Sequence, residues 1–366
     1  MASTVVVYFA TNRLPIGNPV TGFMDVLSSV DGLNIRFGRA IVDVAAKTVQ
    51  LEVAAEQLHA TDAGTGPILG SRQILDEIRR QPEGDVVFLV HGFANTFASS
   101  LEGAVEISVG LGRPVFLFAW ASAGDLGQYM LDRQRAVPSG QALGRVFRIF
   151  MGWLRRLREE GHDCRRPIHL VAHSMGNFVL RHGVQALHAS LGGGEIPLVL
   201  DQVILAAADE DADAFEKVDK LLPLASAARA ITVYHTETDG GLTISDQFKG
   251  NPTRLGHRGP ANMNVIRDNI FAVDVTPVVS KTTGLPDNDP INHWFIRRTP
   301  AVIADANAVL AHEDQFTIGK RALVAGSMRR FIIPKPAAGA RAAAAASAST
   351  RTTRKRAAGK RSRANR

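Results

Sequence analysis

The 366 residues are 45% hydrophobic and 21% charged, a composition that suits one large or two modest globular domains with a full apolar core. The single cysteine, Cys164, excludes an intramolecular disulfide bond and favours a reducing compartment. The net charge of +7 comes from residues 336–366, where nine Lys and Arg residues stand without an acid; residues 1–335 therefore carry a net charge of −2 and give no hint of a charged substrate.

The first residues lack the basic start of a signal peptide, and no apolar run is long enough to span a bilayer. We therefore expect a cytoplasmic protein with no membrane span. Within residues 1–82, three segments have strand-forming patterns: Val5–Ala10, 31–38 and 48–53. A helix is predicted over Ser71–Arg80, with Ser71 as its N-terminal cap.

Apolar strands alternate with helical patterns from residue 85 to residue 312. The strands are predicted at 85–90, 114–120, 168–172, 200–207, 229–234 and 271–275. The helices are predicted at about 98–110, 139–160, from 178 onward, 213–227 and 300–312, with an irregular segment at 121–138. The strand at 85–90 is apolar without alternation, which is typical of burial on both faces. This order predicts an α/β fold with a mostly parallel central sheet and helices on both faces.

The tail, residues 336–366, consists mainly of Ala, Ser, Thr, Arg and Lys. It cannot bury a core, so we predict that it is disordered. The globular domain is expected to span residues 1–335, with its catalytic core at 83–312. The tail either acts as a solubilising end or contacts nucleic acid or another polyanion. It has no interleaved aromatic residues, so base stacking is not expected.

A candidate nucleophile lies in the segment Ala172-His173-Ser174-Met175-Gly176, between an apolar strand and a helical pattern. A tight strand-to-helix turn needs small residues two positions before and after the serine, and it exposes the serine hydroxyl. The helix that follows directs free N–H groups back at the turn, so the N–H of Met175 can stabilise an oxyanion. Taken alone, the motif is also compatible with an ordinary polar turn.

Two further residues follow strand ends in the order that a serine hydrolase of this fold requires. Asp239 comes after the strand at 229–234, and His293 comes after the strand at 271–275. Serine needs a base to take its proton, histidine is such a base near neutral pH, and a carboxylate on the other ring nitrogen fixes the tautomer. We therefore predict Ser174 as nucleophile, His293 as base and Asp239 as acid. The N–H of Phe93 is the predicted second oxyanion donor.

Other residues compete for these roles. Asp209, one strand earlier than Asp239, is the alternative acid, unless it only fixes its loop through hydrogen bonds. Glu237 is a weaker candidate for the acid. His257 precedes the last predicted strand and His312 lies at the end of a helix, so neither is favoured as the base.

Several polar residues near the strand ends are expected to be structural. His173 should pack beneath the serine turn, and His91 should hold the oxyanion loop. Between the strand at 114–120 and the long helix, Asp132 should form a structural ion pair with Arg133 or Arg135; a substrate-facing role for the pair is the alternative. Cys164 lacks a turn motif around it and is a poor nucleophile candidate.

Metal binding is not predicted. Asp209, Asp211 and Asp213 resemble the start of a calcium loop, but the required glycine and closing glutamate do not follow. Asp211 and Asp213 are therefore expected to cap a helix. No group of His, Cys and carboxylate residues has metal-ligand spacing, and no glycine-rich phosphate loop follows a strand. We expect no metal and no other cofactor.

The motifs that carry a family resemblance are His91-Gly92-Phe93-Ala94-Asn95-Thr96, Phe118-Ala119-Trp120-Ala121-Ser122, Tyr129 with Asp132-Arg133, Ala172 to Asn177, Ala207-Ala208-Asp209 with Asp211, Asp213 and Phe215, and Tyr234 with Asp239. Together they resemble the α/β-hydrolase family of uncharacterised bacterial proteins with a lipase- or esterase-like AHSMG nucleophile elbow. The resemblance covers about residues 83–312 and implies a hydrolase fold with esterase-like chemistry, but no particular substrate. Ala121 stands where proline is expected, which bears on the shape of its loop.

These observations predict a serine hydrolase that cleaves a small-molecule or lipid-like carboxylic ester through an acyl-serine intermediate. A thioesterase, amidase or acyltransferase could use the same triad, because the fold does not fix the substrate. The other alternative is a polyanion-binding protein that acts through its tail. Residues 121–138 occupy the position at which hydrolases insert lids.

Overall fold

The computed structural model describes residues 4–58, 69–80, 84–161, 167–243, 253–279 and 289–335. The chain divides into two compact units, Met1–Ile333 and Pro334–Arg366. Cys164 and the basic tail from residue 336 onward lie outside the described residues. The described segments of the first unit form a large sheet with helices on both faces.

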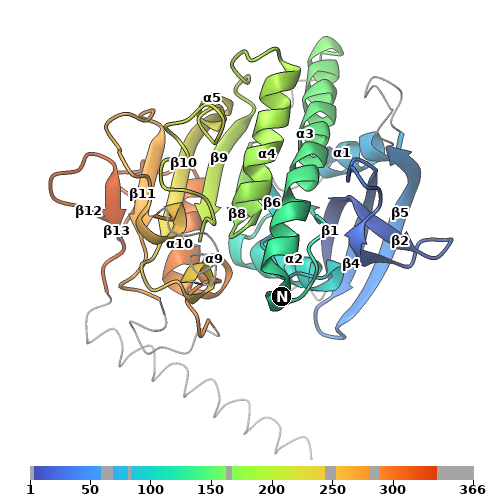
Figure 1. Cartoon of the computed structure of the whole chain (residues 1–366), viewed down its shortest axis with the longest axis horizontal. Helices are drawn as coiled ribbons and strands as arrows, with labels where there is room; N and C mark the ends of the chain where they lie inside the picture. Colours follow the sequence, from blue (N-terminus) through green and yellow to red (C-terminus); the bar gives the residue numbers. More distant parts are fainter. Residues whose placement is uncertain are drawn as a thin grey trace, which may run out of the picture. The chain divides into compact units, whose positions relative to one another are not determined.

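A sheet of 11 strands runs through these segments in the order β12-β13-β11-β10-β9-β8-β6-β7-β1-β4-β5 (Figure 1). Its strands are β1 (Thr4–Thr11), β4 (Ile35–Asp43), β5 (Thr48–Leu58), β6 (Val86–Val90), β7 (Val115–Phe118), β8 (Ile168–His173), β9 (Leu200–Ala206), β10 (Ala228–His235), β11 (Ile270–Asp274), β12 (Ala322–Leu323) and β13 (Arg330–Ile332). All neighbouring pairs from β13 to β1 are parallel, whereas β4, β5 and β12 pair antiparallel at the two edges. The predicted mostly parallel sheet is therefore confirmed.

Helices cover both faces of this sheet (Figure 1). One face carries α1 (Leu69–Arg80), α3 (Tyr129–Glu159), α4 (Gly176–Ser190) and α5 (Leu224–Ala227), and the other carries α2 (Phe97–Leu111), α9 (Phe295–Arg298) and α10 (Pro300–Leu310). Two shorter elements are the 3₁₀ helix η1 (Leu126–Gln128) and α7 (Leu255–Arg258). Among the described residues, no helix combines the length and apolar character needed to cross a bilayer.

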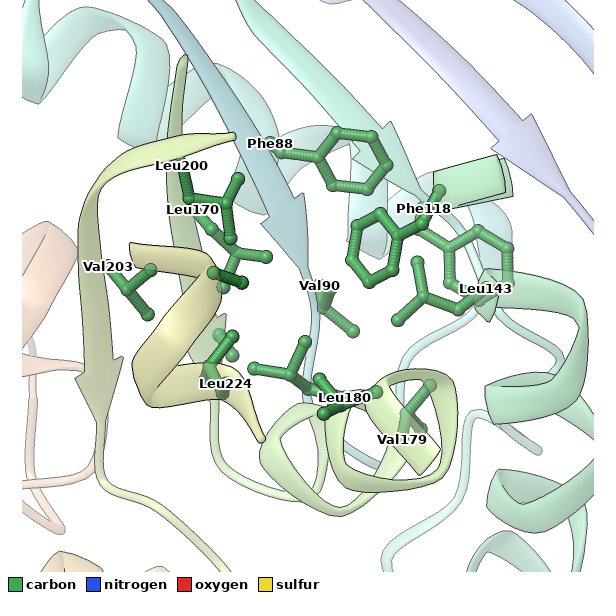
Figure 2. Packing of buried hydrophobic residues seen from close by; sticks show 14 of the residues in the cluster. Phe88, Val90, Phe118, Leu143, Leu170, Val179, Leu180, Leu200, Val203 and Leu224 are labelled. Atoms are coloured by element: carbon green, nitrogen blue, oxygen red, sulfur yellow. The ribbon is translucent and has the colours of Figure 1, made fainter. Parts of the chain in front are cut away.

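The central strands send alternate side chains into two apolar cores. In β6, Phe88 and Val90 belong to the core under α3 and α4, and Val87 and Leu89 belong to the core on the opposite face. Figure 2 shows part of the first core, where strand side chains such as Phe88 and helix side chains such as Leu143 converge. Burial on both faces explains why this strand shows no polar alternation.

Four short strands have no counterpart in the sequence prediction. β2 (Arg13–Ile16) and β3 (Gly22–Leu27) form a separate two-stranded sheet, and β2 contains Pro15, a residue that argues against a strand. β12 and β13 have two and three residues, too few to create a recognisable period. Because β13 pairs with β11, the expectation that the segment at 271–275 is the last strand is wrong.

The helix predicted at 213–227 is also wrong. Turns occupy most of this segment, and α5 covers only Leu224–Ala227, directly after Pro223. Proline has no N–H to donate inside a helix but is tolerated at a helix start. Asp211 and Asp213, expected to be helix caps, instead pair with Lys220, whose Nζ lies 2.9 Å from Oδ2 of Asp211. These ion pairs hold the turns together.

Two other helix boundaries differ from the prediction. α3 begins at Tyr129, ten residues earlier than expected, so much of the segment at 121–138 is helical. Pro138 lies inside this helix, and the residues before it stay helical because Tyr129 and Asp132 are buried against the rest of the protein. α1 begins at Leu69, so Ser71 lies within the helix and is not its cap.

Glycines allow α3 and α4 to pack closely side by side (Figure 1). A Cβ atom added at Gly140 would overlap Cβ of His182, and one added at Gly144 would lie 2.7 Å from Cβ of Ala186. Real Cβ atoms do not approach this closely, so neither position has room for a side chain. The contact fixes α4, which begins two residues after Ser174.

Gly140→Ala is expected to lower the free energy of unfolding by about 1–3 kcal/mol, because the added methyl group overpacks this contact. Gly152→Ala is the matched control: it lies on the same helix, and a Cβ there meets no atom within 4 Å. Alanine's higher helix propensity should make that variant more stable by up to about 1 kcal/mol. Urea unfolding followed by circular dichroism measures both. Equal effects of the two substitutions would contradict the tight contact.

Candidate active site

Ser174 lies at the corner between β8 and α4, with a left-handed backbone φ of 54°. The turn brings three segments together. A Cβ atom at Gly176 would lie 2.5 Å from the carbonyl oxygens of Val90 and His91, and one at Gly92 would lie 2.9 Å from Cβ of Ser174. The small residue at Gly176 is therefore required by the end of β6, and Gly92 lets the next loop approach the serine.

Asp239 and His293 are hydrogen-bonded to each other. Nδ1 of His293 lies 2.8 Å from Oδ1 and 3.0 Å from Oδ2 of Asp239, and both side chains are buried. Asp239 follows β10, and its Oδ1 also accepts a hydrogen bond from the N–H of Leu242 at 3.0 Å. With Nδ1 facing the carboxylate, Nε2 is the nitrogen left for chemistry.

The Asp239 carboxylate changes the titration of His293. Burial opposes the charged imidazolium and lowers the pKa of His293, but the charge of Asp239 and its hydrogen bond to the ring raise this pKa. Asp289 and Asp209 add smaller effects in the same direction, and the net result is a pKa above the ordinary value of 6.5.

The backbone around His293 is held by groups that the sequence prediction missed. Asp289 accepts hydrogen bonds from the N–H groups of His293 at 2.9 Å and Trp294 at 2.7 Å. A Cβ atom at Gly241 would lie 2.6 Å from Cγ and Nδ1 of His293, so only glycine lets the ring lie against this chain segment. Two features of the sequence could have indicated these groups: the glycines directly after Asp239 and the aspartate four residues before His293.

The residues considered as alternative acid or base form other interactions. Oδ2 of Asp209 accepts a hydrogen bond from the hydroxyl of Tyr129 at 2.7 Å and lies 3.6 Å from Nη1 of Arg133. Glu237 is 63% exposed in its side chain and lies 3.4 Å from Nε of Arg258. Nε2 of His257 lies 3.2 Å from the backbone oxygen of Asp239, and Nε2 of His312 lies 3.0 Å from Asp201 at the distal end of β9.

Among the described residues, Asp132 forms no ion pair with Arg133 or Arg135, so the predicted structural ion pair is wrong. Asp132 is buried and accepts hydrogen bonds from the N–H of Ala94 at 3.0 Å, the N–H of Ala123 at 2.6 Å and the hydroxyl of Ser122 at 2.5 Å. It therefore joins the loops after β6 and β7. Arg133 points elsewhere, with its guanidinium 3.7 Å from the ring centroid of Phe178 and close to Asp209.

The backbone N–H groups of Phe93 and Met175 donate no hydrogen bond to any group in the described segments. Met175 is fully buried and Phe93 is partly buried. Buried backbone N–H groups without a partner are rare in proteins, and each is a strong donor for an oxygen that carries negative charge. Met175 directly follows Ser174, and Phe93 follows Gly92, whose added Cβ would lie 2.9 Å from Cβ of Ser174. Two such donors next to the serine turn suit an oxyanion.

His91 and His173 are neutral neighbours of this site. Burial and the charge of Arg13 lower the pKa of His91 to about 3, and its ring stacks on Trp120 at a centroid distance of 5.3 Å. Burial, followed by the charge of His293, lowers the pKa of His173 well below 6.5. Nε2 of His173 lies 2.8 Å from the backbone oxygen of His293, so it links the serine turn to the histidine loop.

A cavity of about 510 Å³ contains both Ser174 and His293 in its lining. Apolar side chains, among them Ile107, Leu126 and Trp294, form part of its wall. The charged groups of the wall are acidic and basic in equal number: Glu102, Glu106, Arg297 and Arg298. This size and composition suit a small, largely apolar ligand without a net charge. The described residues contain no group of three or more His, Cys, Asp or Glu side chains that could hold a metal ion.

Comparison with known proteins identifies the family. The model of a family described as "Alpha/beta hydrolase of unknown function (DUF900)" matches residues 70–312. No protein matches in the search of curated proteins. Two solved structures with 14% sequence identity are a double mutant of the esterase rPPE and a thermostable esterase from Pseudomonas putida ECU1011, with TM-scores of 0.28 and 0.27. Each match covers 66% of this chain, and 59% and 60% of the two esterase chains. Because the family model matches more than half of this chain, the chain belongs to the family of alpha/beta hydrolases of unknown function.

Proposed function

We propose that the protein is a serine hydrolase that cleaves a carboxylic ester through an acyl-serine intermediate. The observation that carries this proposal is the bond between Nδ1 of His293 and Asp239, with His293 and Ser174 in the wall of the same cavity. Membership of a hydrolase family supports the class of reaction. The ester substrate and the roles of these residues belong to the proposal.

In the first half of the reaction, Nε2 of His293 takes the hydroxyl proton of Ser174 while Oγ attacks the ester carbonyl carbon. The N–H groups of Phe93 and Met175 stabilise the oxyanion that forms. Asp239 stabilises the imidazolium through Nδ1. His293 then gives the proton to the departing alcohol oxygen, and the C–O bond breaks to leave an acyl-Ser174 ester.

In the second half, water attacks the acyl carbon and His293 accepts its proton. The second oxyanion collapses, the bond to Oγ of Ser174 breaks, and Oγ recovers the proton from His293. The products are a carboxylic acid and an alcohol, and the free enzyme is restored. Neutral His91 and His173 next to the site would not compete with His293 as proton acceptors, because burial lowers the pKa of both.

The proposal is tested by hydrolysis of p-nitrophenyl esters of increasing acyl length. A cavity of about 510 Å³ with a partly apolar wall should accept short and medium acyl chains, so turnover is expected for the acetate and butyrate esters. Matched p-nitroanilides and thioesters with the same acyl groups decide between the ester and the alternative substrates. Faster turnover of the amide or thioester than of the ester would contradict the ester assignment.

The pH dependence of kcat/KM follows from the raised pKa of His293. Only the neutral ring can accept the serine proton, so activity is lost as pH falls through this pKa. We therefore expect kcat/KM to rise with pH, to reach half of its plateau above pH 6.5, and to stay high on the alkaline side. Initial rates between about pH 5 and 9 at constant ionic strength measure this. A half-point below pH 6.5 would contradict the coupling of His293 to Asp239.

A further inference from the structure

The two proposed oxyanion donors belong to the peptide groups Gly92–Phe93 and Ser174–Met175. Among the described residues, the cis peptide bond joins Asn18 to Pro19, so both of these peptide groups are trans. In a trans peptide the C=O and the N–H point in opposite directions within one plane. The group that holds the carbonyl oxygen of each peptide therefore also sets the direction of its N–H.

The carbonyl oxygen of Gly92 is held from two sides. Nδ2 of Asn95 donates to it at 3.2 Å, and Nδ1 of His91 lies 2.7 Å away. Nδ2 of Asn95 also donates to the oxygen of Phe93 at 2.8 Å. Asn95 is itself fixed, because its N–H donates to Oγ of Ser122 at 3.0 Å.

The carbonyl oxygen of Ser174 is held in the same way. Nδ2 and the backbone N–H of Asn177 both donate to it at 3.0 Å, and the N–H of Asp209 donates at 3.2 Å. Nδ2 of Asn177 also donates to the oxygen of Ala172 at 3.2 Å. Asn177 is fully buried, in the first turn of α4.

Each of these side-chain amides uses its Nδ2 group on two backbone oxygens. An amide nitrogen carries two N–H donors, so neither Asn95 nor Asn177 has one left for a substrate oxygen. Direct contact with an oxyanion is thus not their role. Their common feature is that each holds the peptide oxygen opposite one of the two free N–H groups.

We propose that Asn95 and Asn177 are positioning residues that aim the N–H groups of Phe93 and Met175 at the oxyanion by holding the carbonyl oxygens of the same peptides. The inference rests on the proposed function, because it assumes that an oxyanion forms beside Ser174. Oxyanion donors act only when they are already aimed at the developing charge, so loss of either amide slows the chemical step and leaves ligand binding in the cavity unchanged.

The test measures inactivation of the full chain by a fluorophosphonate probe, with separate values for the maximal rate constant, kinact, and the affinity constant, KI. The variants are Asn95→Ala, Asn177→Ala and the double variant. We expect kinact to fall at least about tenfold in each single variant and about 10²- to 10³-fold in the double variant. KI should change less than about twofold, because Asn177 is not part of the cavity wall and Asn95, which is, has no side-chain N–H left for a ligand oxygen.

Asn269→Ala is the matched control. Nδ2 of Asn269 also donates to two backbone oxygens, those of Ala225 and Ala228, both at 2.9 Å, but Asn269 precedes β11 and does not line the cavity. Its removal should leave both kinact and KI unchanged. Asn95→Asp adds a second variant of nearly the same shape whose carboxylate cannot donate, so its kinact must fall as in Asn95→Ala.

The outcomes separate this inference from the proposed function. If the wild type reacts with the probe and the asparagine variants react equally fast, the inference fails and the serine hydrolase proposal stands. A rise in KI with unchanged kinact would also overturn it, since the asparagines would then act on binding. If the wild type does not react at all, both the proposed function and the inference fail.

Discussion

Ser174→Ala is expected to lower kcat for ester hydrolysis by about 10⁶-fold, because the acyl-serine intermediate can no longer form. The substitution should leave the fold unchanged. Ser174 already adopts a φ of 54°, and alanine occupies similar left-handed positions at Ala94 and Ala207. The backbone N–H of residue 174 donates to the oxygen of Ala206, and its backbone oxygen accepts from the N–H groups of Asn177 and Asp209, so these bonds do not involve the hydroxyl.

Turnover of a p-nitrophenyl ester and the melting temperature, measured on the same preparations, check this expectation. The melting temperature of the variant should match that of the wild type. A folded Ser174→Ala variant that retains more than about 1% of the wild-type kcat would contradict a serine nucleophile at this position. In that case the cavity would bind ligands without the proposed chemistry.

Asp239→Asn is expected to lower kcat by about 10⁴-fold, because the amide cannot stabilise the imidazolium and favours the wrong ring tautomer. Asp209→Asn is the matched comparison. Asp209 is also buried and follows the neighbouring strand β9, but its carboxylate accepts a hydrogen bond from the hydroxyl of Tyr129. We expect Asp209→Asn to lower kcat much less, since Nδ1 of His293 keeps its bond to Asp239.

The two aspartate variants also differ in their pH profiles. Without the charge of Asp239, the pKa of His293 should fall, because burial then acts against the protonated ring with little opposition. The acid limb of the residual activity should therefore move to lower pH in Asp239→Asn. In Asp209→Asn it should move less, since the charge of Asp209 raises this pKa less than the charge of Asp239 does. A larger loss of kcat in Asp209→Asn than in Asp239→Asn would assign the acid role to Asp209.

Local patterns were enough to predict the central sheet. β6 and β8 are apolar runs that come directly before His91 and Ser174. Such runs predict strands buried on both faces without any information about distant residues, and the structure shows this burial. The tight turn at Ser174 was also predictable from local sequence, because the residues two positions before and after the serine, Ala172 and Gly176, are small. Ser174, Asp239 and His293 could be selected as candidates because each of them follows a strand that local sequence predicts.

Other features depend on contacts between distant segments. Asp209 and Asp239 both follow strands, and only the position of the ring of His293 distinguishes them geometrically. Asp132 lies next to Arg133 in the chain, yet it holds the loops at Ala94 and Ala123. Tertiary packing similarly keeps α3 helical before Pro138, against the local preference of proline.

The most direct test of a serine hydrolase site is labelling of the wild type and of Ser174→Ala with a fluorophosphonate probe, with the adducts measured by intact mass. We expect a single adduct on the wild type and none on the folded variant, because only Ser174 is activated by His293. The wild-type reaction should also slow as pH falls through the raised pKa of His293. No adduct on the folded wild type, or an adduct that persists in Ser174→Ala, would contradict a serine hydrolase site at Ser174.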